Sequence, residues 1–542
     1  MNVSTIILKT SIQKWFLCIS VLLSVCGYIL FSLLPPYILS HIIDSLTDQS
    51  KISIYIITIY FFTLLFSNLM LSIRDSLLVI YGQKITHALR TTLMKKYANL
   101  PTITIQKEAP GSIVSRFISD VDTVEALFTD GIISLIADTI SLISILVIIF
   151  HTTKGLFFML LVVLPFLFLF TRHVQKNTLQ SEIKNRKAQQ ETNTLIPQAI
   201  HNIITIHNLN KQSYFEEKYD ASIEKGYQAI SQTNFYDALY SPVIVCTNAC
   251  IVSIVVLLSS TSNPNILAFF SMSAGSAVMI INYISQIFSP IESIGMEITT
   301  IQSAMSGVKR INEFLSYKEK EPCREESIID TNEDIIIQVQ NITFSYGEED
   351  VIKDYSLDIH KGEQITLLGR TGSGKSTLFK LILGLYQPNK GEILVYGKQP
   401  YHLNNQQRRK IFGYVEQSFH PIIGTIKEQI TLYDPMITDT QVEDALRQCN
   451  LYDTVHSFKD GINTNCKEEM FSKGQWQLLS IARAIVLDPL ILMLDEITSS
   501  LDAESEKEII DTLTNVSKDR TVISISHRKN ADIGRSIYLK VQ

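Results

Sequence analysis

The sequence predicts a membrane protein that joins an all-α six-helix transmembrane domain, with long cytoplasmic helical extensions, to an α/β domain. Two observations support this prediction. Long apolar runs recur through the first 316 residues, and a glycine-rich loop lies between a strand-like and a helix-like run in the second half. The 542 residues suffice for two domains. A hydrophobic content of 46% and a mean hydropathy of +0.17 are high for a soluble enzyme, which indicates that part of the chain lies in a lipid bilayer.

The net charge and the cysteine content argue against nucleic-acid binding and against a cysteine-based framework. A formal net charge of −6 gives no indication of nucleic-acid binding. The 7 cysteines include no CxxC pair, and several of them lie in apolar runs. We therefore expect buried or incidental thiols, and we expect the cysteines to form neither a disulfide framework nor a metal site.

The first apolar run extends from Trp15 to Ile38 and predicts a spanning helix. A secretory signal peptide is the competing interpretation. The run is too long for a signal core and has no small-x-small cleavage site, so we favour the spanning helix.

Five more apolar runs follow, and they define a transmembrane domain over residues 1–316. The six predicted spans are residues 15–38, 52–73, 132–150, 156–170, 242–260 and 266–288. Two long charged stretches separate some of them, at residues 74–128 and 172–240, and both are compatible with helix. We expect these stretches to be helical extensions that leave the membrane.

The basic residues predict the orientation of the spans. The short loops hold only Lys51 and Lys154, whereas the two long stretches are rich in basic residues. These are Arg90, Lys95, Lys96, Lys107, Arg116, Arg172, Lys176, Lys184, Arg186 and Lys187. By the positive-inside rule, both extensions and both termini are expected in the cytoplasm.

Arg74 and Asp138 are charged residues near or inside the predicted spans. One interpretation is an intramembrane ion pair or a contact with a substrate. The other is that these side chains reach the membrane–water interface. The sequence leaves both open.

The glycine loop covers nine residues in the second half of the chain. They are Gly369, Arg370, Thr371, Gly372, Ser373, Gly374, Lys375, Ser376 and Thr377. The strand-like run Gln364–Leu368 precedes them and a helical run from Leu378 follows, which is the context of a phosphate-binding loop. Lys375 supplies a charge to the outer phosphates, and the Ser376 hydroxyl suits Mg²⁺. A glycine-rich turn that binds nothing is the alternative, and the complete spacing argues against it.

Two acids follow a second strand-like run in this domain. Residues 491–494 predict a buried parallel strand that places Asp495 at its carboxyl end, where ligands bind such sheets. Asp495 is expected to hold Mg²⁺, and Glu496 to deprotonate an attacking water. His527 follows another apolar strand and could donate to the γ-phosphate, and Tyr346 could stack on adenine. Without the other motifs, His527 would be interpreted as a surface or core histidine and Tyr346 as an aromatic residue of a strand.

Taken in order, these motifs resemble an ABC exporter half-transporter: six spans, a linker at residues 317–334 and an ATP-binding cassette at residues 335–542. The glycine loop matches Walker A, and residues 491–496 match Walker B with its catalytic glutamate. Gln417 matches the Q-loop, Ser499–Asp502 the D-loop, and Phe471–Gln475 stands where the family has its LSGGQ signature. The resemblance implies a P-loop NTPase cassette and an ATPase coupled to transport, with ATP and Mg²⁺ as cofactors.

The resemblance also assigns roles to individual residues. It implies catalytic roles for Glu496, His527 and Gln417, and Mg²⁺ contacts for Ser376, Gln417 and Asp495. The nucleotide would contact Tyr346, the nine residues of the glycine loop, Ser472, Gly474, Gln475 and Asp502. The signature departs from the family at Phe471 and Lys473, but it keeps Ser472 and Gly474, so we expect it to work.

In the family, ATP is closed between the glycine loop of one cassette and the signature of another. The resemblance therefore implies a second half-transporter as partner. We favour a homodimer over a heterodimer because Ser472 and Gly474 are present. The implied function is ATP-driven export, by alternating access, of a drug, lipid or peptide. A non-transporting membrane ATPase with a regulatory role is the alternative.

Overall fold

The computed structural model describes residues 2–49, 53–259, 273–320, 334–347, 349–370, 372–497, 502–518, 520–526 and 534–539. The chain forms two compact units. The first comprises Met1–Ala98 and Glu108–Tyr317, and the second comprises Asn99–Lys107 and Lys318–Gln542.

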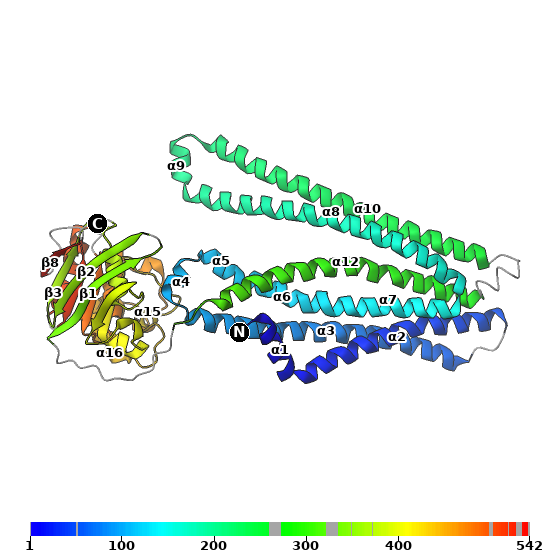
Figure 1. Ribbon diagram of the computed structural model, residues 1–542, viewed down its shortest axis with the longest axis horizontal. Helices are drawn as coiled ribbons and strands as arrows, with labels where there is room; N and C mark the ends of the chain where they lie inside the picture. The colour runs from blue at the N-terminus through cyan, green and yellow to red at the C-terminus, as the bar shows by residue number, and fades with distance from the viewer. Residues whose placement is uncertain are drawn as a thin grey trace. The chain divides into compact units, whose positions relative to one another are not determined.

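The first unit is built from helices (Figure 1). They are α1 (Val3–Gln13), α2 (Trp15–Thr47), α3 (Ile54–Ala98), α5 (Pro110–Ser115), η1 (Arg116–Asp120), α6 (Val121–Ala126), η2 (Leu127–Gly131), α7 (Ile132–Thr152), α8 (Lys154–His201), α9 (Ile203–Asn208), α10 (Gln212–Ser259) and α12 (Ala274–Ser316). The long members carry apolar stretches that continue into charged ones without a break in the helix. The predicted helical extensions are therefore continuations of the spanning helices.

Five helices in the described part of the chain are long and apolar enough to cross a membrane. They are α2, α3, the continuous stretch Pro110–Thr152, α8 and α10. In α12, the apolar segment Ala274–Phe288 is shorter. The predicted sixth span begins at residue 266, and residues 260–272 lie outside the described residues. The boundaries of the six spans therefore stay a prediction.

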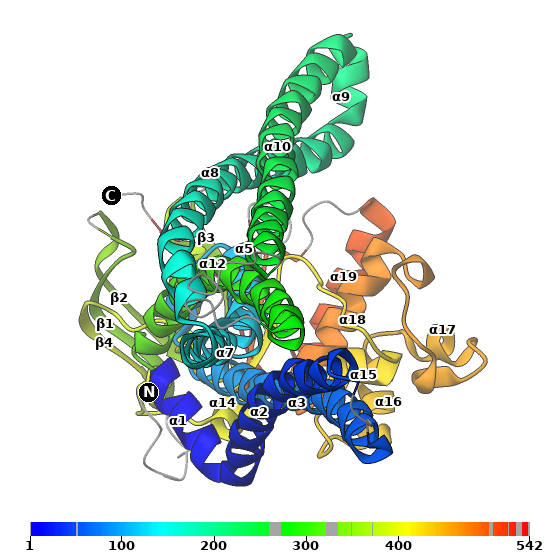
Figure 2. The same ribbon diagram turned by 90° about the vertical axis from the view of Figure 1, so that its right-hand side faces the viewer.

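The second helical extension is formed by the antiparallel helices α8 and α10 (Figures 1 and 2). Polar contacts join them along their length. Thr192 Oγ1 and Ser222 Oγ lie 2.9 Å apart, and Lys225 pairs with Glu191 at 3.2 Å. The short helix α9 connects the two at the far end. These contacts give hydrogen-bond and ion-pair partners to polar side chains in the charged parts of α8 and α10.

An apolar core joins α7, α8, α10 and α12. It includes Ile145, Leu160, Ile251 and Tyr283, all of which are buried. The Tyr283 hydroxyl donates to the backbone carbonyl of Leu33 at 2.6 Å, which connects α12 to α2. A tyrosine can be buried here because its one polar atom has a partner.

Arg74 and Asp138 are not paired with each other in the described structure. The Arg74 guanidinium pairs with the adjacent Asp75 at 2.8 Å and lies over the ring of Tyr28 at 4.7 Å. Asp138 accepts a hydrogen bond from the hydroxyl of Ser293. Each side chain thus has local partners on its own or a neighbouring helix.

The second unit contains two sheets. The antiparallel sheet has the order β2-β1-β4, with β1 (Ile335–Ser345), β2 (Asp350–His360) and β4 (Lys390–Val395). The strand β1 continues past Asn341 because register shifts in its pairing with β2 and β4 accommodate the irregularity there. The second sheet has the order β5-β6-β7-β3-β8.

All neighbours in the second sheet are parallel. Its strands are β3 (Gln364–Leu368), β5 (Phe412–Val415), β6 (Ile491–Asp495), β7 (Thr521–Ile525) and β8 (Arg535–Tyr538). The strands β3, β6 and β7 are almost entirely buried, as their continuous apolar runs predict. Parallel pairing brings the carboxyl ends of β5, β6, β7 and β3 to one edge, where ligands bind such sheets.

Helices cover this sheet and form an additional helical part. They are α13 (Lys375–Ile382), α14 (Asn405–Ile411), α15 (Ile426–Thr431), α16 (Asp439–Gln448), α17 (Tyr452–His456), α18 (Lys473–Ile485) and α19 (Ala503–Val516), with 3₁₀ turns η3 (Pro400–His402), η4 (Gly461–Asn463) and η5 (Glu468–Met470). Helices on a mostly parallel sheet make this unit an α/β domain, as the sequence predicts.

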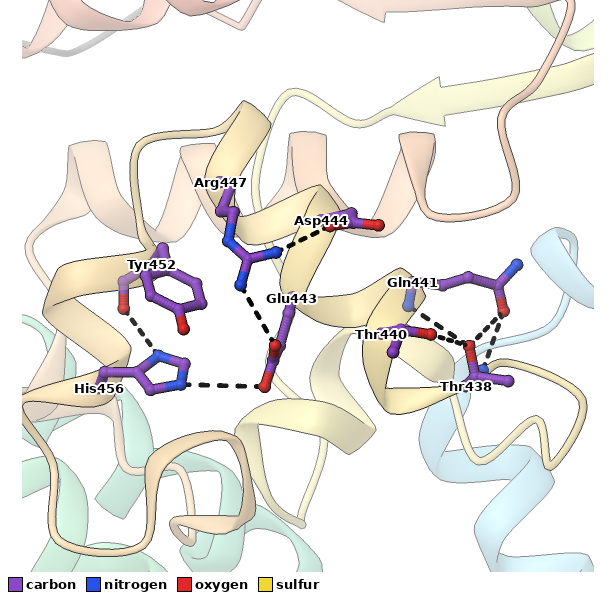
Figure 3. Close-up of polar contacts among 8 residues, drawn as sticks. All are labelled: Thr438, Thr440, Gln441, Glu443, Asp444, Arg447, Tyr452 and His456. Carbon is purple, nitrogen blue, oxygen red and sulfur yellow. Dashed lines mark hydrogen bonds and ion pairs between the residues drawn. The ribbon is translucent and has the colours of Figure 1, made fainter.

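Surface contacts order α16 and α17 (Figure 3). Thr438 caps α16 by accepting a hydrogen bond from the backbone of Gln441. The Arg447 guanidinium pairs with Asp444 at 2.9 Å and with Glu443 at 3.4 Å. It also lies 4.3 Å from the centre of the Tyr452 ring. Exposed pairs of this kind stabilise a fold only weakly. Val442 and Leu446 on the buried face of α16 pack into the core that also holds α18.

The segment Asn99–Lys107 belongs to the second unit although it interrupts the helices of the first. It includes α4 (Thr102–Gln106), whose Ile103 packs against the core of the second unit. The Tyr386 hydroxyl hydrogen-bonds to the side chain of Gln106. Burial raises the pKa of Tyr386 to about 12, so this hydroxyl keeps its proton at neutral pH. The segment Asn99–Lys107 thus has both an apolar and a polar contact within the second unit.

Candidate nucleotide site

The glycine loop connects the end of β3 to the start of α13. Gly372 and Gly374 have φ angles of 86° and 87°, which side chains other than glycine rarely adopt. A Cβ atom at Gly374 would lie 3.2 Å from the carbonyl oxygen of Val351, so the backbone there is packed closely against β2. The positive φ angles give the loop the curved backbone in which consecutive amide groups can face an anion. Thr371 lies outside the described residues.

Lys375 is buried at the base of this loop, with 5% of its surface exposed. Its ammonium donates to the carbonyl oxygens of Gly369 at 2.8 Å and Arg370 at 3.1 Å. Burial lowers the pKa of Lys375, and the nearby Glu496 and Asp495 oppose this shift. A buried cation at the N-terminus of a helix is well suited to bind phosphate oxygens.

The hydroxyl groups around Lys375 differ in their surroundings. Ser373 Oγ is buried and has no hydrogen-bond partner in the described structure, so a ligand in the loop could satisfy it. Ser376 is exposed at the first turn of α13. Thr377 Oγ1 lies 3.2 Å from the hydroxyl of Tyr346. The expected phosphate and adenine contacts therefore lie beside one another.

Tyr346 lies at the end of β1 with 41% of its surface exposed. Its ring packs edge-on against Phe344, at 5.1 Å between centroids, and against Tyr386, at 5.7 Å. These neighbours fix the ring beside α13 and leave part of it open to a planar ligand.

Asp495 is the last residue of β6, one strand removed from β3 across β7. Its Oδ2 accepts a hydrogen bond from the hydroxyl of Tyr414 at 3.3 Å. Burial raises the pKa of Asp495, an effect that this hydrogen bond partly opposes. A desolvated carboxylate near Lys375 suits a divalent cation, which would favour its charged form. The Ser376 hydroxyl and the Asp495 carboxylate are oxygen donors of the type Mg²⁺ prefers, so these residues fit the predicted metal.

Glu496 follows directly and has a φ of 48°, which is uncommon for a residue with a side chain. Its backbone amide donates to the carbonyl of Ile525 on β7 at 3.2 Å. Its Oε2 accepts a hydrogen bond from the side-chain amide of Gln417 at 3.1 Å. The structure therefore brings together Gln417 and Glu496, for which the sequence predicts a shared catalytic role.

The signature residues lie at the start of α18. Ser472 caps this helix by accepting from the backbone of Gln475 at 3.2 Å, and Gln475 Oε1 accepts in return from the Ser472 amide at 2.9 Å. A Cβ atom at Gly474 would lie 2.9 Å from Ser505 on α19. Gly474 therefore has a packing role as well as its predicted nucleotide contact.

The two departures from the usual signature have different surroundings. Phe471 is buried and packs edge-on against Trp476 at 5.2 Å and against Phe458 at 5.8 Å. A larger apolar residue is accommodated there because aromatic neighbours form its pocket. Lys473 is exposed and lines a cavity of about 520 Å³, which Gln417 also lines.

Asp502 caps α19 by accepting a hydrogen bond from the backbone of Ser505 at 3.1 Å. This backbone contact lowers the pKa of Asp502, so the side chain remains an anion. Ser499, Ser500, Leu501 and His527 lie outside the described residues. Ser526, which precedes His527, follows β7 at the edge that also holds the glycine loop.

The sequence did not indicate the role of Tyr414. It pairs with Met493 in the register of β5 and β6, so Asp495, two residues further along, lies on the same face of the sheet. Tyr414 lies three residues before Gln417 in the same strand-like run. The sequence could not show its contact with Asp495, because that contact depends on β5 and β6 being neighbours in the sheet.

Comparison with known proteins identifies both units. Residues 15–291 match the family described as ABC transporter transmembrane region, and residues 352–499 match the family described as ABC transporter. The chain is 30% identical over 461 residues to an ATP-dependent lipid A-core flippase of Francisella tularensis subsp. holarctica (strain OSU18), covering 83% of this chain and 75% of the relative. It is 28% identical over 452 residues to the ABC transporter ATP-binding protein YknV of Bacillus subtilis (strain 168), covering 82% and 74%.

A solved structure of a bacterial Atm1-family ABC exporter with ATP bound has the same fold. Its TM-score is 0.76 at 18% identity, over 97% of this chain and 93% of the other. At this level of identity the likeness applies to the fold.

Proposed function

The chain belongs to the ABC transporters, as a half-transporter in which a multi-pass transmembrane region is fused to an ATP-binding cassette, and from this premise we propose how its residues drive export. Its ATPase activity is coupled to transport across a membrane. We propose that it moves its substrate outward from the cytoplasmic side by alternating access. The observation that most directly supports an ATP-driven mechanism is the arrangement of Lys375, Asp495, Glu496 and Gln417 around the carboxyl edge of one parallel sheet.

In the proposed site, Lys375 leaves its two loop carbonyls and binds the outer phosphates of ATP. The glycine-loop amides hold the remaining phosphate oxygens, and Tyr346 stacks on the adenine. Ser376, Asp495 and Gln417 would hold Mg²⁺, which would neutralise charge on the phosphates. Glu496 accepts the proton of the attacking water, and Gln417 orients the Glu496 carboxylate. His527 would donate to the γ-phosphate.

We further propose that two chains form each working transporter. Ser472 and Gly474 lie at the start of α18, and their described contacts are with Gln475 and Ser505 rather than with the glycine loop of the same chain. A second cassette would present these residues, with Gln475, to the γ-phosphate, and Asp502 would lie at the interface. ATP binding would close the two cassettes, and hydrolysis would let them part.

The proposed membrane arrangement has six spans per chain, at the residues given above, with the cassette and both termini in the cytoplasm. Helix α4, which packs within the second unit through Ile103 and Gln106, would transmit cassette motion to α3 and α5. A homodimer is favoured because this chain carries both a complete set of catalytic residues and an intact signature serine and glycine. A heterodimer with a second half-transporter is the other candidate.

Reconstitution tests this function and separates transport from a purely regulatory ATPase. The purified chain, inserted into lipid vesicles with outward-facing cassettes, should hydrolyse Mg-ATP and accumulate substrate inside. The candidate substrates are drugs, lipids and peptides, and the Francisella relative is named for a lipid. ATP hydrolysis that no candidate substrate stimulates, with no accumulation of any of them, would contradict the exporter assignment.

A further inference from the structure

A cavity of about 430 Å³ lies between α8 and α12 of the helical unit. Its volume is in the range typical of sites for small organic ligands. From α8 it is lined by Phe168, Thr171, Arg172, Gln175, Lys176 and Leu179. From α12 it is lined by Ile291, Ile294, Ile298, Thr299 and Gln302.

The cavity lining is amphipathic. Phe168 lies within the predicted fourth span, and Ile291, Ile294 and Ile298 supply an apolar wall from α12. Arg172 and Lys176 follow the end of that span at residue 170, so they lie where the bilayer core would meet water. The apolar and the cationic parts of one cavity are therefore side by side at the depth of a lipid headgroup.

Within the part of the chain that the structure describes, no acidic side chain neutralises the two cations of the cavity. Neither Arg172 nor Lys176 forms an ion pair with any residue that the structure describes, and none of the described residues that line the cavity is acidic. The two are four residues apart on one helix, an arrangement that places like charges beside each other and is unfavourable. An anion between them would remove this repulsion, and a guanidinium is well shaped to bind two oxygens of a phosphate or carboxylate.

We propose that this cavity binds an anionic amphiphile, with its phosphate or carboxylate at Arg172 and Lys176 and its hydrocarbon chain against Phe168 and the isoleucines of α12. Thr299, Gln175 and Gln302 supply hydrogen bonds for a polar headgroup. This inference rests on the proposed export function and narrows its substrate class to anionic amphiphiles.

Binding can be measured directly on the full-length chain in detergent micelles, with fluorescently labelled phosphatidylglycerol as the probe. We expect saturable binding that unlabelled phosphatidylglycerol competes with and phosphatidylcholine of the same chain length does not. The double variant Arg172→Gln/Lys176→Gln should weaken binding at least about tenfold, because it removes two charge-assisted contacts. The control Lys184→Gln/Lys187→Gln makes the same charge change on exposed positions of α8 outside the cavity and should stay within about twofold.

Three results would overturn the proposal: equal binding of phosphatidylcholine, equal weakening in both double variants, or full displacement of the probe by inorganic phosphate. The last result would mean that the cavity recognises a free anion alone. The variant Ile294→Trp tests the apolar part, since it narrows the cavity and keeps both cations and the polar lining residues. It should weaken phosphatidylglycerol binding, and unchanged binding would place the hydrocarbon chain elsewhere.

This test is independent of ATP hydrolysis. Phosphatidylglycerol binding by a preparation without ATPase activity would contradict the exporter function and leave the cavity assignment standing. ATPase activity without phosphatidylglycerol binding would refute the cavity assignment and leave the exporter function standing.

Discussion

The side-chain amide of Gln417 donates a hydrogen bond to Oε2 of Glu496 across 3.1 Å. The two residues are 79 positions apart in the chain and follow the neighbouring parallel strands β5 and β6. Parallel pairing places both strand ends at one edge, so a residue that follows each can meet there. This contact orients the carboxylate of the predicted general base, and it motivates the first prediction.

Glu496→Gln should retain ATP binding and lower the rate of hydrolysis at least about 100-fold, because an amide cannot accept the proton of the attacking water. Size and hydrogen-bonding geometry stay close to those of the wild type. Steady-state phosphate release and fluorescence titration with ATP measure the two effects. Glu508→Gln, on the exposed side of α19, is the matched control and should be fully active. A rate within about twofold of the wild type would refute the assignment of Glu496 as the base.

Lys375→Ala should weaken ATP binding roughly tenfold to a hundredfold and lower ATPase activity with it, since one charge-assisted contact to the phosphates is lost. Equilibrium titration with a fluorescent ATP analogue provides the affinity. Lys410→Ala removes a lysine from an exposed position on α14 and should bind ATP normally. Unchanged affinity in Lys375→Ala would show that nucleotide binds elsewhere.

Tyr414→Phe should raise the Mg²⁺ concentration needed for half-maximal ATPase activity about fivefold, because Asp495 loses the donor that orients its Oδ2. Mn²⁺ binding in the presence of ATP, followed by electron paramagnetic resonance, should weaken to the same extent. The maximal rate at saturating Mg²⁺ should change little. A lower maximal rate together with unaltered Mn²⁺ binding would instead assign Tyr414 a purely structural role.

Cysteine labelling tests the predicted orientation in a background that lacks the native cysteines. Lys211→Cys, between α9 and α10, should resist a membrane-impermeant thiol reagent in intact cells. Asp48→Cys, after α2, should react. Both positions are exposed, so accessibility within the protein is matched. The reverse pattern would place the cassette on the outer side and disprove the topology derived from the basic residues.

The purified chain alone should hydrolyse ATP with positive cooperativity, because two equivalent sites close together in a homodimer. Ser472→Arg should abolish this activity, since a bulky cation at the start of α18 would prevent the second cassette from closing on ATP. Ser457→Arg, at the exposed residue that follows α17, is a control for the added charge. Activity that appears only after a second half-transporter is added would decide in favour of the heterodimer.

The sequence by itself determined the features that depend on local pattern. The apolar runs predicted the long helices because side chains in lipid must be apolar over about 20 residues. The spacing of glycines, Lys375 and Ser376 between a strand and a helix predicted the phosphate-binding loop, and the strand at residues 491–494 predicted where Asp495 and Glu496 lie. Each of these inferences needs only neighbours along the chain.

The tertiary structure alone decided which distant side chains meet. The contact of Tyr414 with Asp495 depends on the order β5-β6 and on their register, and neither is set by spacing along the chain. The packing of α4 within the second unit through Ile103 and the bond from Tyr386 to Gln106 are likewise long-range. The cavity that brings Arg172 and Lys176 opposite Ile294 depends on how α8 and α12 are rotated about their own axes. Helical periodicity states which residues share a face, but only packing against the other helices selects the direction in which that face points.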